Sequence, residues 1–239
     1  MILFVSPHLD DAVFSAGALI ARLARDHDVV VATVFTASMP APTGFALACQ
    51  TDKGIAADID YMALRRAEDK RALDALGARP VWLDLPEAPH RGYETPAALF
   101  GPRHTADDPA PVAAALAPLV AEADAVFAPV GHGDHVDHHL VRDALDSLGG
   151  AIAWLDLPYA IRAPRAPDTI PMLHPVPATP GDMTAKLAAC AAYESQIGFQ
   201  FSDIAAMRAA LAVAPEQVAA PLHIRDDSVT TAIFDARTD

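Results

Sequence analysis

Two short clusters of histidine and aspartate hold the side chains best suited to chemistry. The first contains His8, Asp10 and Asp11 and directly follows the apolar run 2–5. The second, residues 132–139, holds four histidines and two aspartates and follows the apolar run 125–130. Imidazole and carboxylate groups are ligands of divalent metals such as zinc, and a catalytic zinc typically keeps three protein ligands and one open position for water. The clusters therefore predict a catalytic metal site.

Each cluster also has a simpler interpretation. A lone aspartate before an apolar helix is most often an N-cap, and Asp10 or Asp11 alone would fit that role. A cap requires one side chain, however, whereas this cluster offers three titratable groups, His8 included. A lone histidine at the second position would be a surface residue, but four histidines within eight residues favour a metal site. His135 and His138 are spaced i, i+3 and share one side of a helical turn, so both can face one ion.

Apolar runs of strand length alternate with segments of helical period, and this order determines where the clusters lie. The predicted strands are 2–5, 29–35, 81–83, 125–130 and 151–155, with a late strand near 231–234. The predicted helices are 12–25, 61–76, 111–121, 137–148, 183–195 and 203–211. Strand–helix alternation predicts an α/β fold, a Rossmann-like doubly wound sheet that is mostly parallel with helices on both faces. Residues 1–239 are expected to form a single domain.

The strand order expected for such a sheet brings the two clusters together. In the order 3-2-1-4-5, strands one and four are neighbours at the switch point, and the loops after them open into one crevice. Both clusters occupy those loops. Three long segments, 36–60, 86–108 and 158–182, are also expected to leave the carboxyl ends of strands. Structureless loops of this length are usually functional or mobile.

Composition narrows the class of protein. The chain has 239 residues, 52% of them apolar, and a formal net charge of −14, which argues against a nucleic-acid partner. Cys49 and Cys190 are too few for a disulfide framework, so a reduced, cytoplasmic location is expected. No secretory leader is visible, and no apolar run approaches the roughly 20 residues that a membrane helix needs. The oligomeric state stays open.

The sequence resembles the PIG-L / LmbE-like family of zinc-dependent de-N-acetylases, which remove acetyl groups from N-acetylglucosamine-type sugars. The family's first motif, Ala/Ser-His-Pro-Asp-Asp-Glu, corresponds to residues 7–12, with Leu9 and Ala12 in place of its proline and glutamate. Its second motif, His-x-Asp-His, stands at residues 135–138. Further similarities extend the resemblance over about residues 2–196; they lie at 65–68, 76–77, 154–159, 186–187 and 193–196.

This resemblance implies a role for each residue of the first cluster. His8 and Asp11, with His138, are the implied ligands of one zinc ion. Asp10 is the implied general base, placed beside a ligand where it can take a proton from the water. Zinc would lower the pKa of that water and polarise the amide carbonyl.

The remaining site residues are expected to stabilise charge or bind substrate. By the resemblance, His135 stabilises the oxyanion or protonates the leaving amine, and Asp137 is expected to hold His135 charged and oriented. Arg65 is implied to reach substrate, and its alternative is a solvated helix face paired with Glu68. Other loop residues could form hydrogen bonds with sugar hydroxyls or simply be exposed at the surface; these are Tyr159, His90, Arg91 and His104.

The leading functional prediction is a hydrolase that removes an acetyl group from an N-acetylated amino sugar or its glycoside. One alternative is a metal-dependent amidase or esterase acting on a non-sugar acyl substrate. Another is a catalytically silent domain that binds metal or ligand, against which the presence of Asp10 and His135 argues. A nucleotide-binding Rossmann module is disfavoured because no glycine fingerprint follows the first strand.

Overall fold

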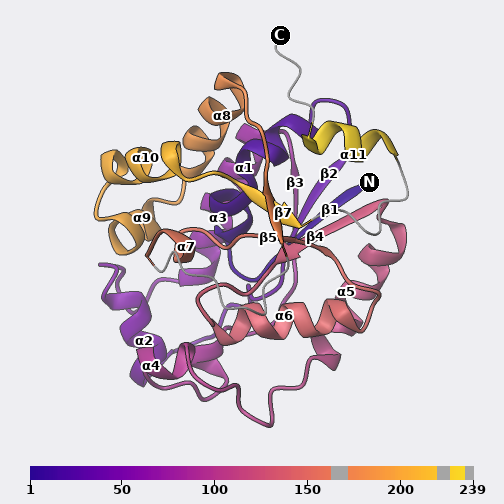
Figure 1. Ribbon diagram of the computed structural model, residues 1–239. Coiled ribbons are helices and arrows are strands. Elements are labelled where there is room, and N and C mark those ends of the chain that lie inside the picture. Colours follow the sequence, from indigo (N-terminus) through magenta and orange to yellow (C-terminus); the bar gives the residue numbers. More distant parts are fainter. Residues whose placement is uncertain (163–171, 220–226, 235–239) are drawn as a thin grey trace.

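The computed structural model describes residues 1–162, 172–219 and 227–234. Within these residues, seven strands form one sheet in the order β3-β2-β1-β4-β5-β7-β6 (Figure 1). The pairs from β3 to β5 are parallel, and the pairs of β7 with β5 and β6 are antiparallel. The strands are β1 (Ile2–Ser6), β2 (Val29–Thr33), β3 (Arg79–Trp82), β4 (Ala125–Pro129), β5 (Ile152–Trp154), β6 (Leu173–Pro175) and β7 (Gln217–Ala219).

Helices cover both faces of this sheet. One layer contains α1 (Asp11–Leu23), α3 (Tyr61–Leu76), α8 (Pro180–Cys190) and α11 (Asp227–Phe234), which pack on one another. The opposite layer contains α5 (Ala110–Glu122) and α6 (Val136–Asp146), with α6 against β4 (Figure 1). The remaining helices of the described residues are α2 (Gly44–Thr51), η1 (Ala88–His90), α4 (Pro96–Leu99), α7 (Tyr159–Arg162), α9 (Glu194–Phe201) and α10 (Ile204–Val213).

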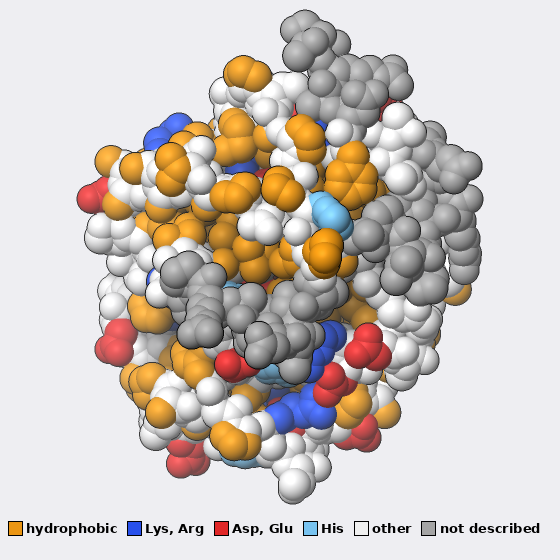
Figure 2. Space-filling view, in the orientation of Figure 1, with side chains coloured by type: hydrophobic (Ala, Val, Ile, Leu, Met, Phe, Trp, Pro, Cys, Tyr) orange, Lys and Arg blue, Asp and Glu red, His pale blue; other side chains and the backbone are white. Residues whose placement is uncertain are grey.

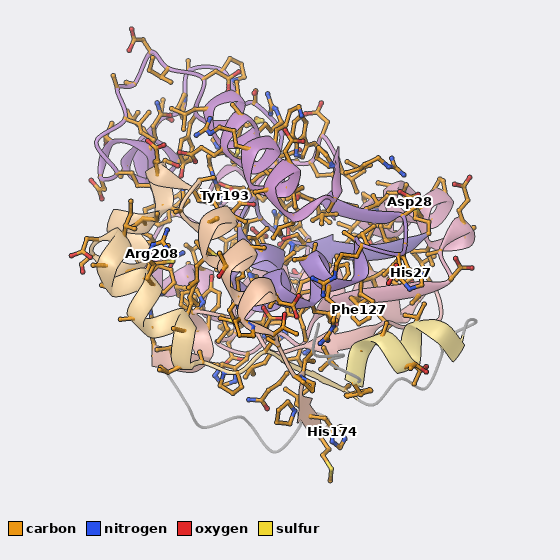
Figure 3. All side chains as sticks on the ribbon, turned by 90° about the horizontal axis from the view of Figure 1, so that it is seen from above. His27, Asp28, Phe127, His174, Tyr193 and Arg208 are labelled. Carbon is orange, nitrogen blue, oxygen red and sulfur yellow. The ribbon has the colours of Figure 1, made fainter. Side chains whose placement is uncertain are left out.

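The central strands are apolar on both sides because each feeds two cores. In β1, Ile2 and Phe4 pack into the core beneath α1 and α8, whereas Leu3 and Val5 pack beneath α5 and α6. Successive side chains of a strand point to opposite faces, so a run of apolar residues suits a strand covered on both sides. The Phe4 ring stacks on Phe127 at 4.5 Å between centroids. Phe127, labelled in Figure 3, is fully buried in the interior of the molecule.

Capping residues explain where the helices that frame the site begin. The Asp60 carboxylate accepts a hydrogen bond from the backbone N–H of Ala63, which starts α3. The same helix ends at Gly77, whose φ of 74° is readily adopted by glycine. Thr179 and Asp182 form a reciprocal capping box at the start of α8.

Helix α1 kinks at Ala16, and the kink is stabilised from a distant part of the chain. The Glu216 carboxylate accepts hydrogen bonds of 2.8 and 2.9 Å from the backbone N–H groups of Ala18 and Leu19. Lys186 forms a buried 2.7 Å ion pair with this carboxylate. A Cβ at Gly17 would lie 3.0 Å from Lys186 Cγ, so the glycine permits the close approach of α8. These contacts fix the helix whose first residue is Asp11.

The predicted α/β fold and the order of the first five strands are confirmed. The strand predicted near 231–234 is wrong, because Val229 and Ile233 are buried at a helical i, i+4 spacing on α11. The helix predicted over 183–195 ends earlier, and α9 starts after a break at Tyr193. The three long segments are not structureless, since they contain the short helices α2, η1, α4 and α7 and the edge strand β6; residues 163–171 lie outside the described ranges.

Apolar side chains gather on the surface over the region of α8 to α10 (Figure 2). Phe199 and Val213 are 64% and 82% exposed there.

In the described ranges, no helix combines the length and hydrophobicity needed to cross a bilayer. The single-domain organisation stays a prediction.

Candidate active site

The two clusters meet at the carboxyl edge of the sheet. Strands β1 and β4 pair in parallel, with Ile2 opposite Ala125, so the loops that follow them lie side by side. The ring of His8 lies 5.5 Å from that of His138 and 4.9 Å from that of His135, measured between centroids. The convergence expected from the strand order is therefore present.

Three donor side chains surround one point at the base of this crevice. Ligand atoms of His8, Asp11 and His138 all lie within 4.8 Å of one another, and all three residues are shielded from solvent or nearly so. Asp11 Oδ2 lies 3.1 Å from His8 Nδ1 and 3.2 Å from His138 Nε2. The arrangement places two imidazole nitrogens and one carboxylate oxygen around a common centre, which is a suitable donor set for zinc.

A carboxylate on the far nitrogen orients each imidazole. His138 Nδ1 lies 2.6 Å from Asp156 Oδ1, and His8 Nε2 lies 2.8 Å from Asp137 Oδ2. Among the described residues, His138 Nε2 is buried and has no hydrogen-bond partner of acceptable geometry. A buried nitrogen of this kind, aimed at a carboxylate and fixed from behind by a second one, fits a metal ligand. The residues present therefore fit a bound ion.

A second set of donors, His8, His135 and Asp137, is also close enough to hold an ion. The Asp137 carboxylate of this second set is already engaged on both oxygens. Asp137 Oδ2 bonds to His8 Nε2 and accepts from the backbone N–H of Ala88 at 3.2 Å, while Oδ1 accepts from Arg91 at 2.6 Å. The hydrogen bonding therefore favours the set with Asp11 and His138.

Asp10 is a buried carboxylate beside these donors. Burial, and after it the neighbouring Asp11, raise the pKa of Asp10 to about 7, against the opposing effect of Arg65, 3.7 Å away. A carboxylate with this pKa is ionised at mildly alkaline pH and still basic enough to accept a proton from water. Its position and its pKa suit a general base.

The expectation that Asp137 holds His135 in its charged form is wrong. The Asp137 carboxylate contacts His8 and Arg91, whereas His135 Nδ1 accepts a hydrogen bond from the Asp137 backbone N–H at 3.2 Å. His135 is the N-cap of α6, which explains this contact. Burial, followed by the positive potential of His8, lowers the pKa of His135 to about 3. The imidazole is therefore neutral at ordinary pH, with its proton on Nε2.

A cavity of about 240 Å³ opens over the two clusters. His8, Asp10, Asp11 and His135 line its base. Its walls combine aromatic and polar side chains; they include Phe45, Phe100, Phe199, Tyr61, Tyr159, Lys53, Arg65, Glu87 and Gln196. A compact organic group could therefore approach the metal position from this side.

A family model described as PIG-L, GlcNAc-PI de-N-acetylase, matches residues 3–148, which is more than half of the chain and includes both clusters. The chain belongs to this family. The resemblance inferred from the sequence is thereby confirmed, and membership places the chain in a family of de-N-acetylases.

Individual relatives are deacetylases. A curated 2'-N-acetylparomamine deacetylase from Streptomyces fradiae is 34% identical over 168 residues, which cover 66% of this chain and 57% of that protein. The match thus spans little more than half of this relative. A zinc-inhibited form of teicoplanin deacetylase superposes with a TM-score of 0.79 at 26% identity, covering 91% of this chain and 96% of that chain. A deacetylase–teicoplanin complex superposes with a TM-score of 0.74 at the same identity and coverage.

Arg65 lies in the wall of the cavity described above rather than on a solvated helix face. Its Nη1 donates to Glu87 Oε1 at 2.5 Å, and its Nη2 donates to the backbone oxygen of Leu9 at 3.3 Å. Glu68, the partner in the alternative interpretation, instead accepts from Ser195. Arg65 can therefore contact a bound molecule through the cavity while stabilising the loop that bears Asp10.

Tyr159 covers the opposite side of the donor set. Its ring packs edge-on against His138, with 5.3 Å between centroids. The loop beside it requires glycine, because a Cβ at Gly133 would lie 2.8 Å from the Tyr159 side chain. The predicted position of Tyr159 near substrate is consistent with its place in the cavity lining.

The other loop residues do not line this cavity. The ring of His104 stacks on Tyr93 at 3.9 Å, and Arg91 turns toward Asp137. Asp156 was not predicted as a site residue, although it follows β5, the strand next to β4, and so lies at the same edge of the sheet. Its position at the carboxyl end of a predicted strand could have identified it as a site residue.

Removing one ligand should abolish metal binding. We expect a His138→Ala variant to lose stoichiometric metal, because only one imidazole and one carboxylate of the donor set would remain. His139→Ala is the matched control, since this neighbouring imidazole is 26% exposed and faces Asp134 instead. Elemental analysis after dialysis measures both variants. Wild-type metal content in His138→Ala would contradict the ligand assignment.

Proposed function

We propose that this chain is a zinc-dependent hydrolase that removes the acetyl group from an N-acetylated amino sugar or its glycoside, of the N-acetylglucosamine type. One observation carries the proposal: the donors His8, Asp11 and His138 converge at the base of a cavity that also exposes Asp10 and His135. Asp10 can accept a proton there, and His135 can donate a hydrogen bond. A site that only stored metal would need neither group.

The deacetylase names of the relatives support the same reaction class. One bound zinc ion, held by His8, Asp11 and His138, would supply Lewis-acid polarisation of the acetamide carbonyl and a water of lowered pKa. The residue assignments and the single ion are part of this proposal.

The protein's own groups then account for the proton transfers. The Asp10 carboxylate takes a proton from the attacking water as the water oxygen bonds to the carbonyl carbon. The neutral His135 donates its Nε2–H toward the carbonyl oxygen as negative charge develops there. Asp10 returns the proton to the amide nitrogen when the C–N bond breaks. The products are acetate and the free amino sugar, so one water is consumed for each acetyl group released.

The cavity supports a sugar as the group that carries the amide. Sugar rings present hydroxyl groups on their edges and apolar C–H surfaces on their faces. The walls offer matching partners, with Arg65, Glu87 and Gln196 as hydrogen-bonding groups and Tyr61 and Phe45 as aromatic surfaces. The relatives named for paromamine and teicoplanin support amino-sugar substrates as well.

A panel of acetylated compounds tests this proposal against a non-sugar amidase or esterase. Zinc-loaded protein is incubated with N-acetylglucosamine, its alkyl and aryl glycosides, N-acetylated aminoglycosides, simple aryl acetamides and aryl acetates. Release of acetate from the amino-sugar compounds alone is expected. Hydrolysis confined to the aryl amides or esters would favour the alternative.

We also propose a cytoplasmic location for the chain. The unpaired Cys49 and Cys190 support it, because free cysteines are usual in a reducing compartment. Fractionation of the native host would measure it. Recovery from the secreted fraction would contradict it.

A further inference from the structure

Arg91 lies behind the cavity and is fixed along every edge of its guanidinium group. Its Nη2 is 2.6 Å from Asp137 Oδ1, and its Nε and Nη2 each donate to a different oxygen of Asp107 at 3.0 Å. Its Nη1 donates to the backbone oxygen of Pro86 at 2.7 Å. The group also lies over the ring of Phe35, 4.7 Å from its centroid. Because the guanidinium group is planar and rigid, only one orientation of it can make all of these hydrogen bonds.

The second carboxylate in this network is itself held. Asp107 Oδ2 accepts a hydrogen bond from the hydroxyl of Tyr93 at 2.9 Å. That hydroxyl accepts in turn from the backbone N–H of His104 at 2.7 Å. The side chain of Asp107 is 9% exposed. Arg91 is therefore anchored in the segment after β3 by groups that are themselves ordered by hydrogen bonds.

The contact with Asp137 leads directly to the metal donors. Asp137 is fully buried, and its Oδ2 lies 2.8 Å from His8 Nε2. Arg91 provides the guanidinium that faces its other oxygen. Removing that guanidinium would leave a buried carboxylate short of a charged partner, which is costly. The carboxylate would then shift, and its hold on His8 would weaken.

The two imidazole donors are supported in different ways. Behind His138, Asp156 Oδ2 accepts from the backbone N–H groups of Gly131 and His132, each at 2.9 Å. That support is made of backbone groups. Behind His8, Asp137 accepts from one backbone N–H group, that of Ala88, and its other oxygen accepts from the Arg91 side chain. One side-chain substitution can therefore loosen the His8 donor and leave the His138 donor in place.

We propose that Arg91 is a positioning residue of the metal site: it holds Asp137, which orients His8 toward the ion. This inference rests on the metal-dependent function proposed above. Outer groups of this kind typically change metal affinity by about 10–100-fold. The effect should appear in metal binding itself, before any substrate is added.

Zinc affinity of the variants measures this role. The Kd for Zn²⁺ is determined by competition with a chromophoric chelator for wild type, Arg91→Ala, Arg91→Lys and Arg103→Ala. Arg91→Ala should bind about 10–100-fold more weakly, and Arg91→Lys should recover part of the loss because it keeps the charge without the fork. Arg103→Ala is the control in the same segment; it pairs with Asp143, 34% exposed, and should bind like wild type.

One further measurement and one replacement variant separate positioning from general damage. The absorption spectrum of the Co²⁺-substituted protein should change in Arg91→Ala and stay unchanged in Arg103→Ala. If Arg91→Ala does not fold, Asp107→Asn replaces it, with an expected weakening near the lower end of the same range.

The outcomes are distinct. Wild-type zinc affinity in the folded Arg91→Ala, or in Asp107→Asn where that variant replaces it, would overturn the positioning role and leave the proposed function intact. Failure of the wild-type protein to bind zinc would overturn both.

Discussion

An Asp10→Asn variant is expected to keep its metal and to lose about 10²–10⁴-fold in the rate of acetate release. The carboxamide has nearly the same shape as the carboxylate but cannot accept a proton from water. Asp10 also works only when ionised, so the wild-type rate should fall on the acidic side of the pH profile. This acidic limb should weaken or disappear in the residual activity of the variant.

The neighbouring aspartate is the control for this experiment. Asp11→Asn should lose metal, because Asp11 Oδ2 lies between His8 and His138. Elemental analysis and rate measurements on the two purified variants distinguish the roles. Loss of metal in Asp10→Asn with retention in Asp11→Asn would mean that the base and the ligand have been exchanged.

His135→Ala should show the second-largest loss. The variant is expected to retain metal and to lower kcat by about 10²–10³-fold, with a much smaller change in KM. The reason is that a hydrogen bond to the carbonyl oxygen strengthens as that oxygen becomes negative. Steady-state kinetics with a soluble N-acetylated amino-sugar glycoside measures both constants.

The pH profile tests the protonation state of His135. Because burial lowers its pKa to about 3, its imidazole is already neutral throughout the working range and should not generate a basic limb. The wild-type and His135→Ala profiles should therefore have the same shape above neutral pH. A basic limb that is present in wild type and absent in the variant would mean that the protonated imidazole is the active form.

Much of the site could be predicted because its residues are contiguous in two short motifs that follow two strands. The apolar runs of β1 and β4 identified the strands, and the expected strand order brought His8 and His138 together. Arg65 was named because it falls in a weaker similarity on the well-formed helix α3. In each case the residue belongs to an element with a clear start signal or period.

The supporting groups could not be predicted in the same way. Asp137 pairs with His8 and Arg91 because the start of α6, the loop after β1 and the segment after β3 meet in space. No spacing along the chain indicates that meeting. The neutral state of His135 follows from burial and from a backbone N–H, which a sequence does not display. The strands β7 and β6, at one end of the sheet, are three residues long each and have no visible period.

Hydrolysis of an amino-sugar acetamide by this chain should depend on its bound metal. The most direct measurement is the yield of acetate and of free amine, by proton NMR, from one N-acetylglucosaminide incubated with metal-free protein before and after zinc is restored. We expect no turnover by the metal-free protein, and equal amounts of acetate and amine after zinc is added. Equal yields with and without metal, or no acetate from any acetylated amino sugar, would contradict it.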